Sequence, residues 1–306
     1  MEKAIELREI SKKIGDQDIL HNVSMTIKKG SIYGFLGPNG SGKTTVMKII
    51  LNLLKADSGI VKVFNHVVEP TSYKYLQTIG SIIEYPVFYD HLSAWENLNL
   101  HCEYSGYYNK EQIHKVLDIV GLKDIKKKKV KEFSLGMKQR LGIARTLITQ
   151  PEILLLDEPI NGLDPFGIRE VRELLVRINQ ELGTTILISS HIISEIESIS
   201  DTIGFIKNGR MVREVERSML AQENLQYIEV TVSDVKKAVQ VLDETLMLKN
   251  FKVISTSKIR IYEQEVDSKE INRELVLHGV DILAVDQQSN TLEEYFMELM
   301  SEGEKR

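Results

Sequence analysis

The stretch GFLGPNGSGKTT at residues 34–45 decides the fold of this chain. It contains the pattern G-x-x-x-x-G-K-T, with Gly37, Gly42, Lys43 and Thr44 in register. Glycines let backbone N–H groups wrap a chain of phosphates, the lysine reaches the outer phosphates and the threonine hydroxyl can hold Mg²⁺. The sequence therefore predicts a phosphate-binding loop at these residues.

The flanks of this stretch decide between a phosphate loop and a chance glycine-rich turn. SIYGFL at residues 31–36 has the composition of a strand, and VMKIILNLL at residues 46–54 has the apolar pattern of a helix. A strand, a glycine-rich loop and a helix in that order are the context that a phosphate loop requires. The flanks therefore favour the phosphate loop over the chance turn.

A second element supplies the acidic groups that such a loop needs. EILLLDEP at residues 152–159 is an apolar run of strand length that ends in Asp157 and Glu158. Two acids after a hydrophobic strand are by themselves an ordinary strand end. Beside a phosphate loop, we expect Asp157 to act on the Mg²⁺ shell and Glu158 to orient or deprotonate the attacking water. The pair predicts hydrolysis rather than binding alone.

Composition bounds the class of protein. The chain has 306 residues, of which 42% are hydrophobic and 27% charged, so it can bury a sizeable core and has the length of about two domains. Its formal net charge of -5 argues against binding to nucleic acid. The basic run at residues 126–129 is interpreted as a solvated loop, and a phosphate or lipid contact is the alternative.

The patterns of cysteine, histidine and hydropathy limit the cellular compartments in which the chain is expected. Cys102 is the only cysteine, which excludes an internal disulfide, and the histidines lack the spacing of zinc ligands, so no zinc is expected. No stretch approaches the ~18 unbroken apolar residues of a membrane helix, and the first residues do not resemble a secretory signal. We therefore expect a cytoplasmic protein that reaches the inner face of the membrane only through a partner.

Strand-like and helical segments alternate along the first two thirds of the chain, which predicts an α/β layer architecture. From about residue 90 to 150 the pattern is almost wholly helical, so we expect a helical subdomain inserted between two strands. The character of the sequence changes near residue 215. We predict a nucleotide-binding domain at residues 1–215 and a small α+β domain at residues 216–306.

A third motif separates this chain from other proteins with phosphate loops. FSLGMKQR at residues 133–140 opens a helical segment whose N-terminal dipole can face an anion. It resembles the signature LSGGQ-x-Q-R of the ATP-binding-cassette (ABC) ATPases. The positions that match that signature are Ser134, Gly136, Lys138, Gln139 and Arg140, and those that depart from it are Phe133, Leu135 and Met137.

Two further motifs follow in the order of that family. NGLDP at residues 161–165 resembles the D-loop, and SSHIISEIE at residues 189–197 places His191 at the position of the switch histidine. With the phosphate loop, the acidic strand end and the signature, five motifs agree over residues 3 to about 215. The resemblance implies the fold of a P-loop NTPase, with a mixed sheet as its core and a helical subdomain.

The resemblance also implies a site shared between two copies of the domain. In this family the signature of one cassette completes the γ-phosphate site of the other, which implies a head-to-tail dimer and, for Ser134 and Gly136, a role in trans. Glu158 is then the catalytic carboxylate, and His191 contacts the γ-phosphate; the alternative for His191 is a hydrogen-bonded histidine at a strand end. We expect ATP and Mg²⁺ as cofactors. The remaining residues expected to bind ATP are Gly37, Pro38, Asn39, Gly40, Ser41, Gly42, Lys43, Thr44, Thr45 and Asp164.

One departure from the family falls in IGSIIEYPVFY at residues 79–89, where an apolar strand-like run closes on Glu84. Most cassettes have a glutamine here that touches Mg²⁺ and water beside the groove for the membrane subunit. A carboxylate about 5 Å from a phosphate charge is repelled by roughly 3 kcal/mol at an effective dielectric near 20, unless a cation lies between them. We expect Glu84 to join Thr44 and Asp157 as a metal ligand; a solvated acid is the alternative.

A second departure concerns the adenine base. Cassettes usually stack adenine on an aromatic side chain ~23 residues before the phosphate loop, where this chain has Ile14. Base stacking on an aromatic side chain contributes roughly 1 to 3 kcal/mol in single-stranded nucleic-acid complexes. The departure predicts weaker nucleotide binding, unless another aromatic fills the slot. Leu135 likewise replaces a small glycine next to the expected phosphate contact.

The Glu84 motif together with the signature resembles the ATPases of bacterial exporters for bacitracin resistance and lantibiotic immunity. That subfamily implies a cytosolic ATPase that serves a separate integral-membrane permease. The alternative is a permease-independent cassette ATPase acting on nucleic acid or ribosomes, and a third possibility is a regulatory subunit without hydrolysis. The C-terminal domain shows no catalytic constellation, and its ending LEEYFMELM resembles the tail of many such exporters. Packing is the expected role of Tyr295, Phe296 and Leu299, with a partner site as the alternative.

Overall fold

The computed structural model describes residues 2–107, 109–217, 226–263 and 266–289. The chain divides into two compact units, residues 1–217 and residues 218–306, and each is described by itself. Tyr295, Phe296 and Leu299, expected to pack in the C-terminal unit, lie outside the described residues.

The first unit contains an antiparallel sheet with the order β2-β1-β4-β5. β1 and β2 are long strands joined by a two-residue turn at Gly15 and Asp16, and Gly15 has a φ of 58°. Such a left-handed conformation costs glycine little, which suits a tight hairpin. The strands of this sheet are β1 (Lys3–Ile14), β2 (Gln17–Lys28), β4 (Ser58–Val63) and β5 (His66–Val67).

A mixed sheet of six strands with the order β10-β9-β3-β8-β7-β6 forms the centre of this unit. β9, β3, β8, β7 and β6 run parallel, and β10 is antiparallel to β9. β3, β7 and β8 are buried along their whole length, which explains their uninterrupted apolar composition. The strands are β3 (Ile32–Leu36), β6 (Ile79–Ile82), β7 (Ile153–Leu156), β8 (Thr185–Ser190), β9 (Thr202–Lys207) and β10 (Arg210–Glu216), and the 3-10 helix η1 (Lys74–Thr78) precedes β6.

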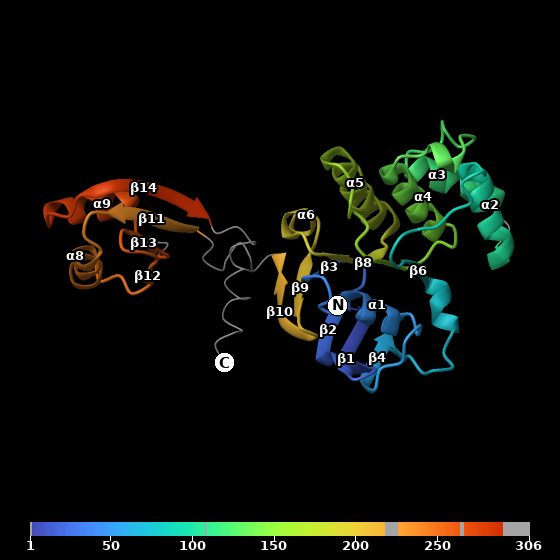
Figure 1. Ribbon diagram of the computed structural model, residues 1–306, viewed down its shortest axis with the longest axis horizontal. Coiled ribbons are helices and arrows are strands. Elements are labelled where there is room, and N and C mark those ends of the chain that lie inside the picture. The colour runs from blue at the N-terminus through green and yellow to red at the C-terminus, as the bar shows by residue number, and fades with distance from the viewer. Residues whose placement is uncertain (1, 108, 218–225, 264–265, 290–306) are drawn as a thin grey trace. The chain divides into compact units, whose positions relative to one another are not determined.

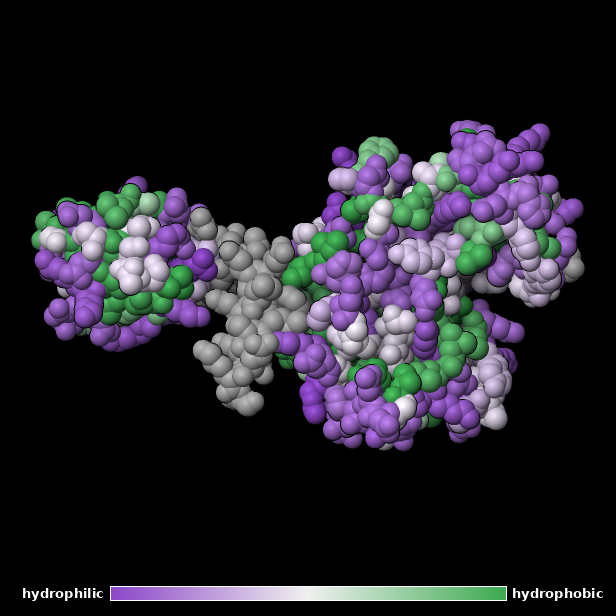
Figure 2. Space-filling model, in the orientation of Figure 1, coloured by the Kyte–Doolittle hydropathy of each residue, from purple (hydrophilic) through white to green (hydrophobic). Residues whose placement is uncertain are grey.

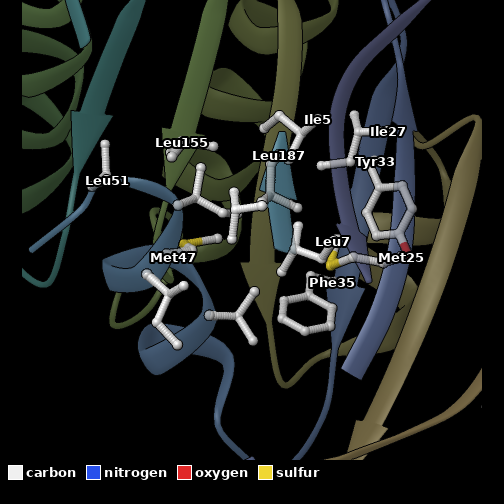
Figure 3. Close-up of a cluster of buried hydrophobic side chains, with 14 of the residues drawn as sticks. Ile5, Leu7, Met25, Ile27, Tyr33, Phe35, Met47, Leu51, Leu155 and Leu187 are labelled. Carbon is white, nitrogen blue, oxygen red and sulfur yellow. The ribbon is translucent and has the colours of Figure 1, made fainter. Parts of the chain in front are cut away.

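One face of the six-stranded sheet packs against α1 (Lys43–Ile50) and the antiparallel sheet. Figure 3 shows the resulting apolar cluster, in which Tyr33 and Phe35 of β3 meet Met47 of α1 and side chains of β1, β2, β7 and β8. Successive residues of a strand point to opposite faces, so Gly34 faces the other way. A Cβ on Gly34 would lie 2.2 Å from Cγ2 of Ile196, so the helix there packs directly on the strand backbone.

Helices cover the opposite face of the sheet. α4 (Leu135–Leu147) packs against β6, α5 (Pro165–Leu182) against β8, and α6 (Ile193–Glu197) against β3 and β8. The mixed sheet with helices on both faces confirms the predicted α/β fold. Among the helices of the described residues, none has the length and apolar character to cross a bilayer. Figure 2 shows hydrophobic and hydrophilic side chains interleaved over the visible face of the chain.

Between β6 and β7 the chain forms α2 (Ala94–Ser105), α3 (Lys110–Ile119), the 3-10 turn η2 (Val130–Glu132) and α4. The helices α2, α3 and α4 group together in Figure 1, in the region where the helical subdomain is expected. Ser93 and Glu96 form a reciprocal capping box that fixes the start of α2. The lysine run at residues 126–129 lies between α3 and η2 and is largely exposed. Cys102 is buried in α2, and burial raises the pKa of its thiol.

The second unit is a small α+β fold with an antiparallel sheet in the order β12-β13-β11-β14. Its element sequence βαββαβ and this strand order define a ferredoxin-like arrangement. Apolar side chains of β11, β13, α8 and α9 form its own core, including Val230, Ile259 and Ile271. Its elements are β11 (Gln226–Val232), α8 (Val235–Gln240), the π-helical turn η3 (Val241–Thr245), β12 (Phe251–Val253), β13 (Lys258–Ile261), α9 (Ser268–Leu277) and β14 (Ile282–Ser289).

We predict that Leu187→Ala strongly destabilises the first unit. Leu187 is 0% exposed in β8 and belongs to the core beneath the phosphate loop, and a buried leucine replaced by alanine costs about 2 to 5 kcal/mol. The measurement is the free energy of unfolding in denaturant. Leu53→Ala is the control, since Leu53 is 68% exposed and we expect a change below about 0.5 kcal/mol. Equal effects of the two substitutions would contradict this description of the core.

Candidate functional site

The predicted site residues that follow β3, β6, β7 and β8 gather where these four neighbouring parallel strands end. The carboxyl ends of β3, β8, β7 and β6 lie at one edge of the sheet because these strands are adjacent and parallel. The phosphate loop follows β3, His191 follows β8, Asp157 and Glu158 follow β7, and Glu84 follows β6. Open α/β sheets bind ligands at this edge. Residues far apart in the sequence are therefore brought to one place.

The phosphate loop runs from Gly37 to Gly42 between β3 and α1. Gly40 and Gly42 have φ angles of 78° and 107°, which side chains other than glycine rarely adopt. A Cβ on Gly37 would lie 2.3 Å from the carbonyl oxygen of Ile206, so this position accepts no side chain. Ser41 is buried, and its carbonyl accepts a hydrogen bond from the N–H of Gly209 at 3.0 Å. Of the other residues predicted to bind ATP, Pro38 and Asn39 lie in the exposed part of the loop, and Thr45 lies in α1.

Lys43 is held inside this loop. Its Nζ donates to the carbonyl oxygen of Gly37 at 2.6 Å and to that of Pro38 at 3.2 Å. The same Nζ lies 3.2 Å from Oε1 of Glu158. Lys43 is buried, so its positive charge is balanced by carbonyl dipoles and one carboxylate rather than by water. The loop therefore presents a fixed positive charge next to the acidic strand end.

A chain of hydrogen bonds joins α1 to the ends of β7 and β8. Oγ1 of Thr44 donates to Oδ2 of Asp157 at 2.7 Å, and Oγ of Ser189 donates to Oδ1 of the same carboxylate at 2.7 Å. Oγ of Ser189 in turn accepts the N–H of Glu158 at 2.9 Å. Ser189 is a site residue that the sequence reasoning did not assign. It stands two positions before His191 in the motif that resembles the switch region, which is the signal that points to it.

Glu158 and His191 form the third part of the site. Nδ1 of His191 lies 2.8 Å from Oε2 of Glu158, and Glu158 has a φ of 48°. A positive φ is unfavourable for a residue with a side chain, and such strain collects at functional sites. Glu158 is thus contacted by the Lys43 ammonium on one oxygen and by an imidazole on the other. A carboxylate held in this way is suited to accept or orient a proton of water.

The oxygen atoms of Thr44 and Asp157 fit Mg²⁺. They converge within 2.7 Å of each other beside the phosphate loop. Mg²⁺ prefers oxygen donors and is usually bound by one or two carboxylates together with substrate phosphates. The described residues contain no group of three or more His, Cys, Asp or Glu side chains that could hold a metal ion.

Glu84 makes a different contact from the one expected. β6 ends at Ile82, and Glu84 follows it with a φ of 63° and a side chain that is 68% exposed. Its Oε1 lies 3.1 Å from Nζ of Lys48, one turn along α1 from Thr44. An exposed ion pair of this kind contributes at most about 1 kcal/mol. Glu84 therefore lies on the side of α1 that carries Thr44, while its role as a metal ligand stays a prediction.

The signature and D-loop residues lie at helix N-termini. Ser134 caps α4, and its Oγ accepts the N–H of Met137 at 3.3 Å. Asp164 caps α5, and its Oδ1 accepts the N–H of Gly167 at 2.9 Å. Within the described part of the chain, no hydrogen bond or ion pair joins Ser134, Gly136 or Asp164 to the phosphate loop. Their roles in binding ATP, in trans for the first two, stay predictions.

The expected adenine position lies at the end of β1. Ile14 pairs with Gln17 across the hairpin and is 49% exposed. The consequence of this departure for nucleotide affinity stays a prediction.

Residues 20–161 match the family model for the ABC transporter. The ABC transporter ATP-binding protein YcbN of Bacillus subtilis is 49% identical over 97% of both chains. The bacitracin transport ATP-binding protein BcrA of Bacillus licheniformis is 41% identical over 99% of both chains. The lantibiotic transport ATP-binding protein SrtF of Streptococcus pyogenes is 46% identical over 72% of this chain and 94% of its own.

Solved structures of ABC transporter proteins are also similar to this chain. CbiO1 of Clostridium perfringens, part of an ABC transporter complex, has a TM-score of 0.66 at 26% identity and covers 73% of this chain and 92% of its own. The cassette MJ0796, in a dimeric post-hydrolysis state bound to ADP and Pi, has a TM-score of 0.61 at 27% identity and covers 70% of this chain and 98% of its own.

The chain belongs to the ATP-binding proteins of the ABC transporter family. It is an ATPase of that family, whose cassettes bind ATP or ADP.

We predict that Glu84→Ala lowers ATP hydrolysis or its coupling to transport far more than Glu84→Gln. A glutamine oxygen still reaches a metal ion, whereas alanine offers none. The measurement is phosphate release as a function of Mg²⁺ concentration. Lys48→Ala is the matched control, because it removes the same ion pair without removing the oxygen ligand. If all three variants behave alike, the ion pair with Lys48 explains Glu84 and the metal-ligand hypothesis is wrong.

Proposed function

We propose that this chain is the ATPase subunit of an ABC exporter that binds ATP and Mg²⁺ between two copies arranged head to tail. The observation that carries the proposal is the cluster of Lys43, Thr44, Asp157, Glu158 and His191 at one sheet edge. In this assembly Lys43 and the loop N–H groups bind the phosphates of ATP. Thr44 and Asp157 hold Mg²⁺, with Glu84 as the third expected ligand; the ion neutralises the phosphate charge when bound.

Glu158 orients the attacking water and accepts its proton. His191 contacts the γ-phosphate and, through its Nδ1, keeps Oε2 of Glu158 in place. The Lys43 contact on the other oxygen restricts the carboxylate further. Positioning of the water and electrostatic stabilisation together supply most of the catalysis in phosphoryl transfer. These groups are the ones required for hydrolysis, which speaks against a purely regulatory subunit.

The second copy supplies Ser134 and Gly136. The chain has one phosphate loop and one signature, and the N-terminus of α4 is an anion-binding end. Gly136 has no packing reason to be glycine, since a Cβ there would meet its nearest atom, Cδ2 of Leu163, at 3.8 Å. A glycine that its own chain does not need is consistent with close approach of a phosphate from the partner.

A separate permease docks at a hollow between the core and the helical subdomain. The hollow has a volume of about 560 Å³ and is lined by residues of η1, β6, α2 and α4, with His101, Tyr107 and Arg145 as its charged or titratable residues. Burial, with Arg145 nearby, lowers the pKa of His101. The hollow joins the strand that leads to Glu84 with the helix that carries the signature. Movement of a permease segment bound in this hollow therefore acts on both the strand that leads to Glu84 and the helix that carries the signature.

The proposed cargo is a peptide antibiotic such as bacitracin or a lantibiotic. BcrA and SrtF carry such functions in their names and align with 99% and 72% of this chain. The subunit then sits at the cytoplasmic face of the membrane, held by its permease. A permease-independent ATPase acting on nucleic acid or ribosomes is the alternative.

We predict that Gly136→Ala leaves the fold intact but reduces ATP hydrolysis at least about tenfold, since alanine is well tolerated in a helix and only the partner's phosphate needs the space. Thermal unfolding and steady-state phosphate release are the two measurements. Glu158→Gln serves as a companion variant: it is expected to bind ATP without hydrolysis and to form ATP-dependent dimers in size-exclusion chromatography. A chain that stays monomeric under these conditions and keeps full activity in Gly136→Ala would refute the head-to-tail site.

We predict that co-expression of the chain with a permease encoded beside it raises bacitracin or lantibiotic resistance in a sensitive bacterium, and that Glu158→Gln abolishes the gain.

Ser105→Trp, which fills the rim of the hollow, should abolish resistance and membrane recovery without lowering ATP hydrolysis by the isolated chain. Tyr104→Trp is the matched control, because Tyr104 is exposed and outside the lining. Co-sedimentation with ribosomes and no gain of resistance would instead support the permease-independent alternative.

A further inference from the structure

A basic segment between α3 and η2 has no role in the site described above. Residues 122–132 contain six lysines and two acids, so the segment has a formal charge of +4, and the rest of the chain, whose total is -5, has -9. The lysines are Lys123, Lys126, Lys127, Lys128, Lys129 and Lys131. Like charges gathered in one short segment repel one another, so their position requires an explanation.

The segment is held in place by its backbone and by two buried side chains. Leu122 and Val130 are both 0% exposed. The N–H of Val130 donates to the carbonyl oxygen of Leu92 at 2.9 Å, and the N–H of Trp95 donates to that of Lys126 at 3.1 Å. A turn that is fixed before binding loses little conformational entropy when it binds. The lysines therefore form a preorganised surface next to the start of α2.

Few of the positive charges are neutralised within the chain. Asp118 of α3 pairs with Lys123 at 3.4 Å. Two further acids of the neighbouring elements are bound to other groups, since Asp90 pairs with Lys138 at 3.2 Å and Glu96 belongs to the capping box of α2. The exposed lysines of the segment that enter no ion pair among the described residues are Lys127, Lys128, Lys129 and Lys131.

The charge distribution favours a membrane surface over a nucleic acid or a free phosphate. A nucleic acid extends across a protein and would meet the net charge of -9 on the rest of the chain. A single phosphate is bound by donors that converge on one point, whereas these lysines are exposed around a turn. Anionic lipids present many head groups in one plane, which attracts clusters of about four to eight basic residues.

An exposed aromatic side chain accompanies the lysines. The N–H of Lys131 donates to the carbonyl oxygen of Asp90 at 2.9 Å, and the residue before Asp90 is Tyr89, which is 50% exposed. Asn97 fixes the backbone of Tyr89: its Oδ1 accepts the N–H of Tyr89 at 2.9 Å, and its Nδ2 donates to the carbonyl oxygen at 3.1 Å. Tyrosine suits the head-group region of a membrane, because its ring is apolar and its hydroxyl is polar.

We propose that residues 122–132 bind the surface of a membrane that contains anionic phospholipids. The inference goes beyond the proposed function, because contact with lipid requires neither a permease nor ATP. The signature FSLGMKQR begins at residue 133, directly after this segment. Contact with the membrane therefore holds the part of the helical group from which the signature starts.

The test is binding of the full chain to lipid vesicles, measured by co-sedimentation. One set of vesicles contains phosphatidylcholine with about 30% phosphatidylglycerol, and the other contains phosphatidylcholine alone. A lysine near an anionic surface strengthens binding about fivefold, so we expect a partition coefficient at least about fiftyfold higher on the anionic set. The screening length falls from about 10 Å at 0.1 M salt to about 3 Å at 1 M, so added KCl should remove most of this difference.

Substitution of three lysines locates the contact on the chain. Lys127→Gln, Lys128→Gln and Lys131→Gln together should lower the partition coefficient on anionic vesicles at least about tenfold. All three side chains are exposed, so we expect the free energy of unfolding to stay nearly unchanged.

A second triple substitution is the matched control. Lys55→Gln, Lys74→Gln and Lys236→Gln remove the same net charge from positions outside the segment. These three lysines are also exposed and enter no ion pair among the described residues. We expect the control to lower the partition coefficient by less than about threefold, because charges more than a screening length from the surface act weakly.

Trp95 provides a measurement that needs no substitution. It is the only tryptophan of the chain, and its backbone is bonded to Lys126. Energy transfer from Trp95 to a dansyl-labelled lipid should therefore appear when the unmodified chain binds anionic vesicles, and it should disappear at high salt. This measurement decides the inference if the lysine triple does not fold.

Equal binding to both sets of vesicles, an equal loss in the control triple, or binding without energy transfer from Trp95 overturns the inference. Displacement of the vesicles by inorganic phosphate at constant ionic strength also overturns it, because the segment would then bind a free anion. Binding to single-stranded RNA that the lysine triple abolishes, with none to vesicles, assigns the segment to nucleic acid and overturns it as well.

The proposed function is judged separately. If co-expression with the permease gives no resistance, the role in export fails, whereas binding to vesicles without a permease still decides the contact with lipid. If the vesicle assay fails while resistance is gained, the lipid contact is wrong and the exporter function stands.

Discussion

The hydrogen bond between Thr44 and Asp157 is the contact on which the site depends. It joins the first turn of α1 to the end of β7, two segments separated by 113 positions in the sequence. The bond is possible because β3 and β7 lie on either side of β8 in a parallel sheet and end at the same edge. Ser189 at the end of β8 completes the arrangement by binding the other oxygen of Asp157. Three consecutive strands of the sheet are thus connected through one carboxylate.

Electrostatic balance explains why the neighbouring groups are placed as they are. Removing the charges of Lys43 and Glu158 from water is unfavourable, and their attraction compensates only when further hydrogen bonds satisfy both groups. The carbonyl groups of the phosphate loop do so for Lys43, and His191 does so for Glu158. The strained backbone of Glu158 is tolerated because its N–H is bonded to Ser189. The acidic strand end is therefore fixed by contacts on its backbone and on both of its carboxylate oxygens.

The sequence predicted the fold class and the main groups of the site, because these depend on local patterns. A glycine-rich loop between a strand and a helix, and acids at the end of an apolar strand, are visible without knowledge of the strand order. Ser189 was not predicted, since its role arises only when β8 lies between β3 and β7. The contact of Glu84 with Lys48 depends on the backbone turn after Ile82 and on the facing side of α1. Likewise, the capping contact of Asp164 with Gly167 appears once the start of α5 is known.

The buried thiol of Cys102 has a practical consequence. Burial in α2 shields it and raises its pKa, so little reactive thiolate forms near neutral pH. Because the chain has no other cysteine, a cysteine introduced on the surface would be the sole site open to maleimide dyes or spin labels. Labels at chosen surface positions could then be studied by fluorescence or by electron paramagnetic resonance without first removing a native residue.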